Sequence, residues 1–220
     1  MKPRFSILVT ICVLAAGTVG TGTAQATPIP SHATAQAEIF ATSNRALITD
    51  PADPRLKTRL LRFDREVRDV IRANGGRTST SRLLEGVYWS SEQKNTTYEP
   101  SREFDVNRVS ASGLHHIAGV LAKQYHQESV LTFRYLPRTA PDAKAIEIEA
   151  PGIDARRLHD ALVADSAARD RLGGGSVATG GRLILVTPRA DLALARKFVT
   201  GLGVDWSAAQ VRYGAEELVG

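Results

Sequence analysis

The chain has 220 residues, of which 43% are hydrophobic, 23% charged and 6% aromatic, and its formal net charge is +5. This composition is typical of a globular protein and excludes a wholly disordered chain, a collagen-like rod and a coiled-coil rod. The positive charge is too mild to indicate a dedicated nucleic-acid binder, so we expect no nucleic-acid partner.

The first 26 residues have the pattern of a secretory signal peptide. Two basic residues, Lys2 and Arg4, precede an uncharged apolar run from residue 5 to residue 16. That run is about a dozen residues long, short of the roughly 20 needed to cross hydrocarbon. Small residues follow it and end in Ala24-Gln25-Ala26, so we expect cleavage after Ala26, secretion, and no integral membrane segment in the mature chain. A later triplet that ends at Ala37 is the alternative cleavage point.

The only cysteine, Cys12, lies inside this leader. Cleavage leaves a chain of about 190 residues without cysteine, which excludes disulfides, thiolate zinc sites and cysteine nucleophiles and leaves burial as the source of stability. Cleavage also removes Lys2 and Arg4, which lowers the formal charge from +5 to +3.

Residues 27–52 are predicted to be a flexible tether, because they are rich in Ala, Thr, Ser and Pro and show no sustained period. Residues 53–76 are predicted to be an amphipathic helix that begins at Asp53-Pro54 and ends at Asn74-Gly75-Gly76. The polar face of this helix is strongly basic. It indicates a solvated surface, with a site for anionic polymers or membrane headgroups as the alternative.

Residues 77–220 are predicted to form a ferredoxin-like α+β domain. The patterns predict strand 82–89, helix 110–125, strand 129–136, strand 145–150, helix 154–172 and strand 182–187, which is the order β-α-β-β-α-β. A helix over 190–200 and a strand over 210–213 extend the domain. We expect an antiparallel sheet with its helices on one face and the opposite face open to water or to a partner.

Alternation in two strands predicts which side chains occupy the open face. The apolar positions are expected to point at the helices: Leu131, Phe133, Tyr135, Ile146 and Ile148. The polar positions between them are expected on the open side, together with Thr132. Arg134, Glu147 and Glu149 are therefore candidate binding residues.

Residues 90–109 are predicted to be a long loop between strand 82–89 and helix 110–125. Long loops in compact domains often carry function, and Tyr98 is the candidate binding residue here. The carboxylates of this loop lack the ordered alternation of a calcium loop, so neither a metal site nor a cofactor is predicted.

The alternative hypothesis is a small enzyme that uses a histidine and a carboxylate. His115 and His126 are eleven residues apart on one predicted helix, roughly 16 Å at 1.5 Å per residue, which is too far to share a metal ion. Either histidine, paired with Glu99 or Glu103, would provide the acid and base of a small hydrolase-like enzyme. The leading hypothesis assigns no catalytic residue.

The glycine-rich segment Gly173–Gly181 is predicted to be a mobile turn with no phosphate role. A phosphate loop leaves a strand and enters a helix, whereas this segment leaves a helix and enters a strand. The leading hypothesis is therefore a small exported, non-catalytic binding protein that uses the open sheet face and the 90–109 loop. No motif identifies its partner as a protein or as a small molecule.

Overall fold

The order of helices and strands found in the first half of the chain occurs again in the second half. The computed structural model describes residues 37–43, 48–58, 60–125, 131–137 and 144–219, which belong to one compact unit, residues 33–220. Only the backbone is described for residues 41–43, 57, 58, 125, 131–137 and 217–219. The first half contains β1 (Ala37–Ser43), α1 (Arg55–Thr58), α2 (Leu61–Ala73), β2 (Arg77–Ser90), β3 (Asn95–Asn107), α3 (Ala111–Tyr125) and β4 (Leu131–Pro137).

The second half repeats this order. It contains β5 (Ala145–Pro151), α4 (Ala155–Ala164), α5 (Ser166–Leu172), β6 (Gly174–Ala178), β7 (Arg182–Pro188), α6 (Leu192–Gly201) and β8 (Gln210–Gly214), and a short strand β9 (Glu217–Val219) follows. Both halves thus read β-α-β-β-α-β when α1 with α2, and α4 with α5, are each counted as one helical segment.

In the described part of the chain, nine strands form one sheet in the order β8-β5-β7-β6-β2-β3-β1-β4-β9. Every pairing is antiparallel. When the strands of each half are numbered in chain order, both halves have the order 4-1-3-2. The halves meet where β2 pairs with β6, so equivalent strands lie antiparallel and the two halves are related by an approximate two-fold axis.

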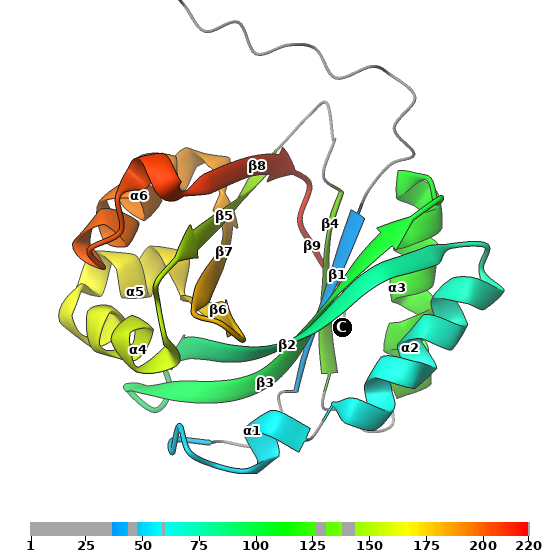
Figure 1. Ribbon diagram of the computed structural model, residues 1–220, viewed down its shortest axis with the longest axis horizontal. Coiled ribbons are helices and arrows are strands. Elements are labelled where there is room, and N and C mark those ends of the chain that lie inside the picture. The colour runs from blue at the N-terminus through cyan, green and yellow to red at the C-terminus, as the bar shows by residue number, and fades with distance from the viewer. Residues whose placement is uncertain (1–36, 44–47, 59, 126–130, 138–143, 220) are drawn as a thin grey trace, which may run out of the picture. The chain divides into compact units, whose positions relative to one another are not determined.

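The sheet curls until its two edges approach one another. Strands β8 and β9 stand at opposite ends of the sheet order, yet only residues 215 and 216 separate them in the chain. A chain spans at most about 3.6 Å per residue, so the two edges are close at this link. The sheet therefore has an outer face and an inner face, and the strands of the two halves lie between two groups of helices (Figure 1).

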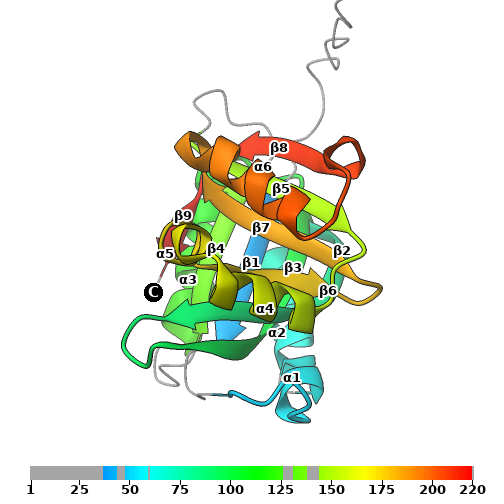
Figure 2. The same ribbon diagram turned by 90° about the vertical axis from the view of Figure 1, so that its left-hand side faces the viewer.

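The helices cover the outer face and bury its apolar side chains. Helices α2 and α3 lie against the first half, and α4, α5 and α6 lie against the second (Figures 1 and 2). In the first half the rings of Phe63 and Phe104 meet edge to face at 6.0 Å, and Val67 and Ile71 are fully buried. None of the helices in the described residues is long and apolar enough to cross a membrane.

The predicted α+β class is confirmed, whereas the ferredoxin-like order over residues 77–220 is not. The four strands of that prediction are β2, β4, β5 and β7, which come from both halves. Strand β5 pairs with β7 and β8, and β4 pairs with β1 and β9, so these four strands do not form one sheet in the predicted order. The prediction failed because it lacked β1, β3 and β6.

Each of the three missed strands has a sequence that does not resemble a strand. Strand β3 lies within the predicted 90–109 loop, and buried polar residues such as Thr96, Ser101 and Glu103 gave it a loop-like composition. Strand β6 lies within the predicted Gly173–Gly181 turn, where glycine allows a close approach to β2. Strand β1 lies within the predicted 27–52 tether, so the tether is wrong for residues 37–43, and residues 27–36 lie outside the described residues.

The predicted helices are present, but two of them are interrupted. The 53–76 segment forms α1 and α2, and α2 ends at Ala73 with Asn74 as its C-cap, before Gly75 with its positive φ of 80°. The 154–172 segment breaks at Asp165, whose side chain accepts a hydrogen bond from the Ala168 N–H at 3.0 Å and so caps α5.

Candidate functional site

The inner face of the sheet carries a group of charged side chains from both halves. We call it the inner-face ion cluster. Its carboxylates are Glu38 on β1, Glu103 and Asp105 on β3, and Glu147 and Glu149 on β5, and its guanidinium groups are Arg82 on β2, Arg182 on β7 and Arg212 on β8. Four of these carboxylate residues are almost inaccessible to solvent: Glu38 is 0% exposed, Glu103 1%, Glu147 1% and Glu149 6%.

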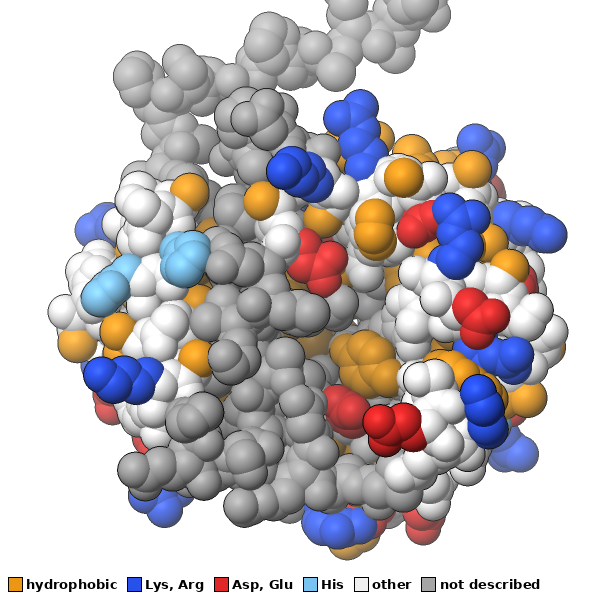
Figure 3. Space-filling view, turned by 180° about the vertical axis from the view of Figure 1, so that it is seen from behind, with side chains coloured by type: hydrophobic (Ala, Val, Ile, Leu, Met, Phe, Trp, Pro, Cys, Tyr) orange, Lys and Arg blue, Asp and Glu red, His pale blue; other side chains and the backbone are white. Residues whose placement is uncertain are grey.

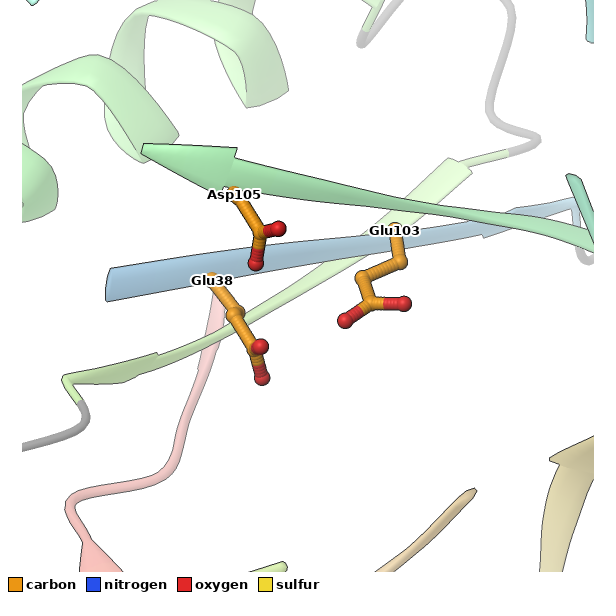
Figure 4. Close-up of side chains that lie close together, drawn as sticks. All are labelled: Glu38, Glu103 and Asp105. Atoms are coloured by element: carbon orange, nitrogen blue, oxygen red, sulfur yellow. The ribbon is translucent and has the colours of Figure 1, made fainter. Parts of the chain in front are cut away.

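The pairing of β1 with β3 brings three of these carboxylates together. Glu38 is directly opposite Asp105, and Phe40 is opposite Glu103, so the two-residue period of the strands places the acidic side chains on one face. The three carboxylates lie side by side on that face (Figure 4). Each offers an oxygen atom within 4.8 Å of the others, which is close enough for all three to contact one metal ion.

Arg212 joins the carboxylates of the second half to those of the first. Its Nε donates to Glu147 Oε1 at 2.8 Å, and its Nη2 donates to both Glu147 and Glu149. The same Nη2 lies 3.7 Å from Glu38 Oε1. Burial acts to lower the pKa of Arg212, but Glu147 and Glu149 outweigh it and raise that pKa, so the guanidinium stays charged.

Arg82 and Arg182 complete the ion pairs of the cluster. Arg82 donates to Glu103 Oε1 at 2.6 Å, and Arg182 lies 2.8 Å from Glu149 Oε2. Burial is the main reason that the pKa of Glu103 is raised to about 7, against the opposing effect of Arg82. Glu147 and Asp105 raise this pKa further through charge repulsion, which makes Glu103 the proton-exchanging member of the cluster near neutral pH.

An open pocket of about 510 Å³ lies beside the ion cluster and connects it to solvent. It is lined by Thr80, Ser81, Arg82, Asp105, Glu149, Arg182, Gln210 and Arg212. Asp105 belongs both to this lining and to the carboxylate triplet with Glu38 and Glu103. Carboxylate oxygens are ligands for hard cations such as Ca²⁺, Mg²⁺ and Mn²⁺, so the residues that would hold a metal ion here are Glu38, Glu103 and Asp105.

Two of the predicted binding residues lie in this cluster, in surroundings that the sequence did not indicate. Ile146 and Ile148 are fully buried among the helices, and Glu147 and Glu149 are on the opposite face, so the predicted alternation of β5 is confirmed. The expectation that this face is open was wrong for both glutamates, because the curled sheet brings other strands in front of it.

The remaining predicted binding residues are separated from these glutamates. Arg134 is opposite Phe40 in the pairing of β4 with β1, and its side chain lies outside the described residues, as do those of Leu131, Thr132, Phe133 and Tyr135. Tyr98 is on β3 and 4% exposed, and its ring stacks on His159 with centroids 5.9 Å apart. It therefore belongs to the core of the second half, and its assignment to an exposed loop was wrong.

The predicted histidine and carboxylate pair does not form from the residues that can be placed. His115 is exposed on α3, which covers the outer face, whereas Glu103 is buried on the inner face. Histidine side chains (pale blue) lie on the molecular surface in the view from behind (Figure 3). Glu99 is half-buried on β3, and His126 lies outside the described residues. The sheet thus separates His115 from Glu103, and that catalytic pairing was wrong.

Sequence reasoning missed Glu38, Asp105, Arg82, Arg182 and Arg212 as members of one site. A signal was present in part, since Glu103 and Asp105 alternate with Phe104 and Val106, and Arg212 lies between Val211 and Tyr213. Glu38 gave no such signal, because its segment resembled a tether.

Glu103→Gln is expected to reduce the pH dependence of stability between pH 4.5 and 7. Because the folded state raises the Glu103 pKa from 4.5 to about 7, the folded chain binds this proton more tightly, and the free energy of unfolding falls as pH rises through that window. The fall attributable to Glu103 is up to about 3 kcal/mol, at about 1.4 kcal/mol per pKa unit. Urea unfolding at several pH values from 5 to 8 measures it.

The matched control for this prediction is Glu85→Gln. Glu85 is on β2 but opposite Val177, on the outer face, so this substitution should leave the pH profile of the wild type unchanged. Parallel profiles for the wild type and Glu103→Gln would contradict a raised pKa at Glu103.

Comparisons with known proteins provide no assignment for this site. No family model matches the chain, and no curated protein matches it. Among solved structures the chain is similar to a crystal structure described as "putative glycine cleavage system transcriptional repressor", with 15% identity over 82% of this chain and 97% of that one and a TM-score of 0.29. Similarity at that level carries no argument about function.

Proposed function

We propose that this chain is an exported binding protein that takes up a small cationic ligand at the inner-face ion cluster. The observation that carries the proposal is the carboxylate triplet of Glu38, Glu103 and Asp105, which lies beside an open pocket that Asp105 also lines.

Neighbouring carboxylates repel one another, and either a proton or a bound cation reduces that repulsion. Glu103 takes a proton near neutral pH, so protons and the ligand compete for the same negative charge. The volume of about 510 Å³ is suited to a small molecule or ion rather than to a macromolecule.

The leader supports the exported part of this proposal. Its basic start, short apolar run and Ala24-Gln25-Ala26 ending are the features of a cleaved signal peptide. Cleavage after Ala26 leaves β1 complete, whereas cleavage after Ala37 removes the first residue of that strand. Binding is favoured over catalysis because the proposed acid and base, His115 and Glu103, lie on opposite faces of the sheet.

Titration calorimetry of the purified chain with Mn²⁺ and, separately, with the organic dication putrescine tests the proposal. We expect saturable binding of one of the two at pH 8 and weaker binding at pH 6, because Glu103 is protonated at the lower pH. Both a metal ion and an organic ammonium group bind carboxylates through positive charge. Comparing the affinities for Mn²⁺ and putrescine shows which of the two the site prefers.

Variants decide whether the observed binding belongs to the cluster. Glu38→Gln and Asp105→Asn should each weaken binding at least about tenfold, equivalent to about 1.4 kcal/mol, whereas Glu85→Gln on the outer face should leave it unchanged. The proposal is overturned if neither cation binds at millimolar concentration, or if the cluster variants bind as tightly as the wild type.

A further inference from the structure

A second pocket, of about 850 Å³, lies where α2 ends and the chain enters β2. We call it the arginine pocket. It is lined by Arg68, Arg72, Gly75, Gly76, Arg77, Thr78, Ser79, Asn107 and Arg108. Four of these residues are arginines and no carboxylate is among them, so the pocket has the opposite charge to the inner-face ion cluster.

Two of the four arginines form ion pairs with aspartates on α2. Arg68 lies 3.1 Å from Asp64, and Arg72 lies 2.8 Å from Asp69. Among the described residues, neither Arg77 nor Arg108 has a carboxylate partner. Because Arg77 is opposite Asn107, the residue before Arg108, the pairing of β2 with β3 brings these two arginines to the same end of the sheet.

A helix end explains only part of this positive charge. The carboxyl end of α2 carries a partial negative charge that favours Arg72 in its last turn. Arg77 begins a strand and Arg108 follows one, so neither is part of the helix. Their positions beside the same pocket therefore call for a different explanation.

The backbone around the arginine pocket departs from regular geometry at the same place. Arg108 has φ = 66°, a left-handed conformation that favours glycine and costs about 1 kcal/mol or more for most other residues. The pairing of β2 with β3 shifts register between Thr78 and Ser81. The Thr78 hydroxyl is buried and has no hydrogen-bond partner among the described residues. Bulges and strained residues are concentrated at binding sites.

We propose that the arginine pocket binds a small oxyanion with at least two negative charges, of the phosphoryl or polycarboxylate class. Guanidinium groups bind such oxygens with paired hydrogen bonds, and a volume of about 850 Å³ accommodates a ligand of this size. This site is separate from the inner-face ion cluster, so it does not depend on the proposed cation-binding function.

Arg108→Gly tests the proposal without threatening the fold. Glycine adopts φ = 66° without strain, so the variant should be at least as stable as the wild type while it lacks the guanidinium group. Titration calorimetry of the full chain with pyrophosphate and, separately, with citrate at low ionic strength should show saturable binding that weakens at least about tenfold in Arg108→Gly. The tighter of the two ligands distinguishes the phosphoryl source from the carboxylate source.

Lys94→Gly is the matched control. Lys94 is also a non-glycine residue with a positive φ, 53°, and its substitution by glycine also removes one positive charge. Lys94 lies in the turn between β2 and β3 and does not line the arginine pocket. The affinity of the Lys94→Gly variant for the anion should equal that of the wild type. Equal binding by Arg108→Gly and the wild type, an equal loss in Lys94→Gly, or no saturable binding of either anion overturns the proposal.

Discussion

Gly174→Ala is expected to destabilise the fold by roughly 3–5 kcal/mol, because the new methyl group has no room at the junction of the two halves. A Cβ atom at this position would overlap the carbonyl oxygen of Val87 and lie 2.7 Å from the Cα of Tyr88. These are backbone atoms of β2, which cannot move without opening the pairing with β6. The φ of Gly174 is 144°, which adds conformational strain for any other residue.

Gly180→Ala separates the steric effect from the conformational one. Gly180 also has a positive φ, 95°, but no atom lies within 4 Å of a Cβ built there. The free energy of unfolding of this variant should fall by only about 1–2 kcal/mol, which is the cost of a positive φ for alanine. Urea unfolding of both variants measures the difference, and equal losses would contradict the close contact of β2 with β6.

Arg212→Met is expected to cost about 3–5 kcal/mol at pH 7, because it removes the cation shared by several buried carboxylates. Methionine retains most of the apolar volume, so the loss is mainly electrostatic. Glu147 and Glu149 are hydrogen-bonded to this guanidinium and are 1% and 6% exposed.

Two comparisons test the electrostatic origin of this loss. Adding Glu147→Gln to Arg212→Met should recover part of the stability, because one unpaired negative charge is removed. Arg65→Met, at an exposed position of α2, should change stability by less than about 0.5 kcal/mol. A loss of stability in Arg212→Met with no recovery in the double variant would show that the guanidinium acts only through packing.

The duplicated arrangement explains why the ion cluster consists of residues that are distant in sequence. The helices on the outer face bury the apolar side chains of that face, and first-half residues such as Val87 and Tyr98 join the core of the second half. The inner faces are turned towards one another by the curl of the sheet, so polar residues from β1, β3, β5 and β8 meet there. The smaller inner apolar group, Phe40, Leu84, Ala145, Ala178, Ile184 and Val186, accompanies the charged residues on this face.

The sequence by itself determined the elements whose pattern is local. The amphipathic helix predicted over 53–76 is present as α1 and α2, and Phe63, Val67 and Ile71 form the buried face of α2. The alternation of Ile146 and Ile148 with two glutamates predicted the faces of β5. These predictions succeeded because an apolar stripe against a polar one depends only on the 3.6-residue and two-residue periods of the chain.

Only the tertiary structure decided the duplication, the curl of the sheet and the site. Strands β1, β3 and β6 are held by pairing with neighbours on both sides rather than by their own propensities, so segments rich in Thr, Ser and Gly become central strands. Burial of Glu38 and Glu103 is tolerable only where Arg82 and Arg212 come from other strands to meet them. From the sequence alone, a charged residue is predicted to be exposed to solvent. Its burial depends on an oppositely charged partner from another strand, and the strand order that provides this partner cannot be inferred from the local pattern.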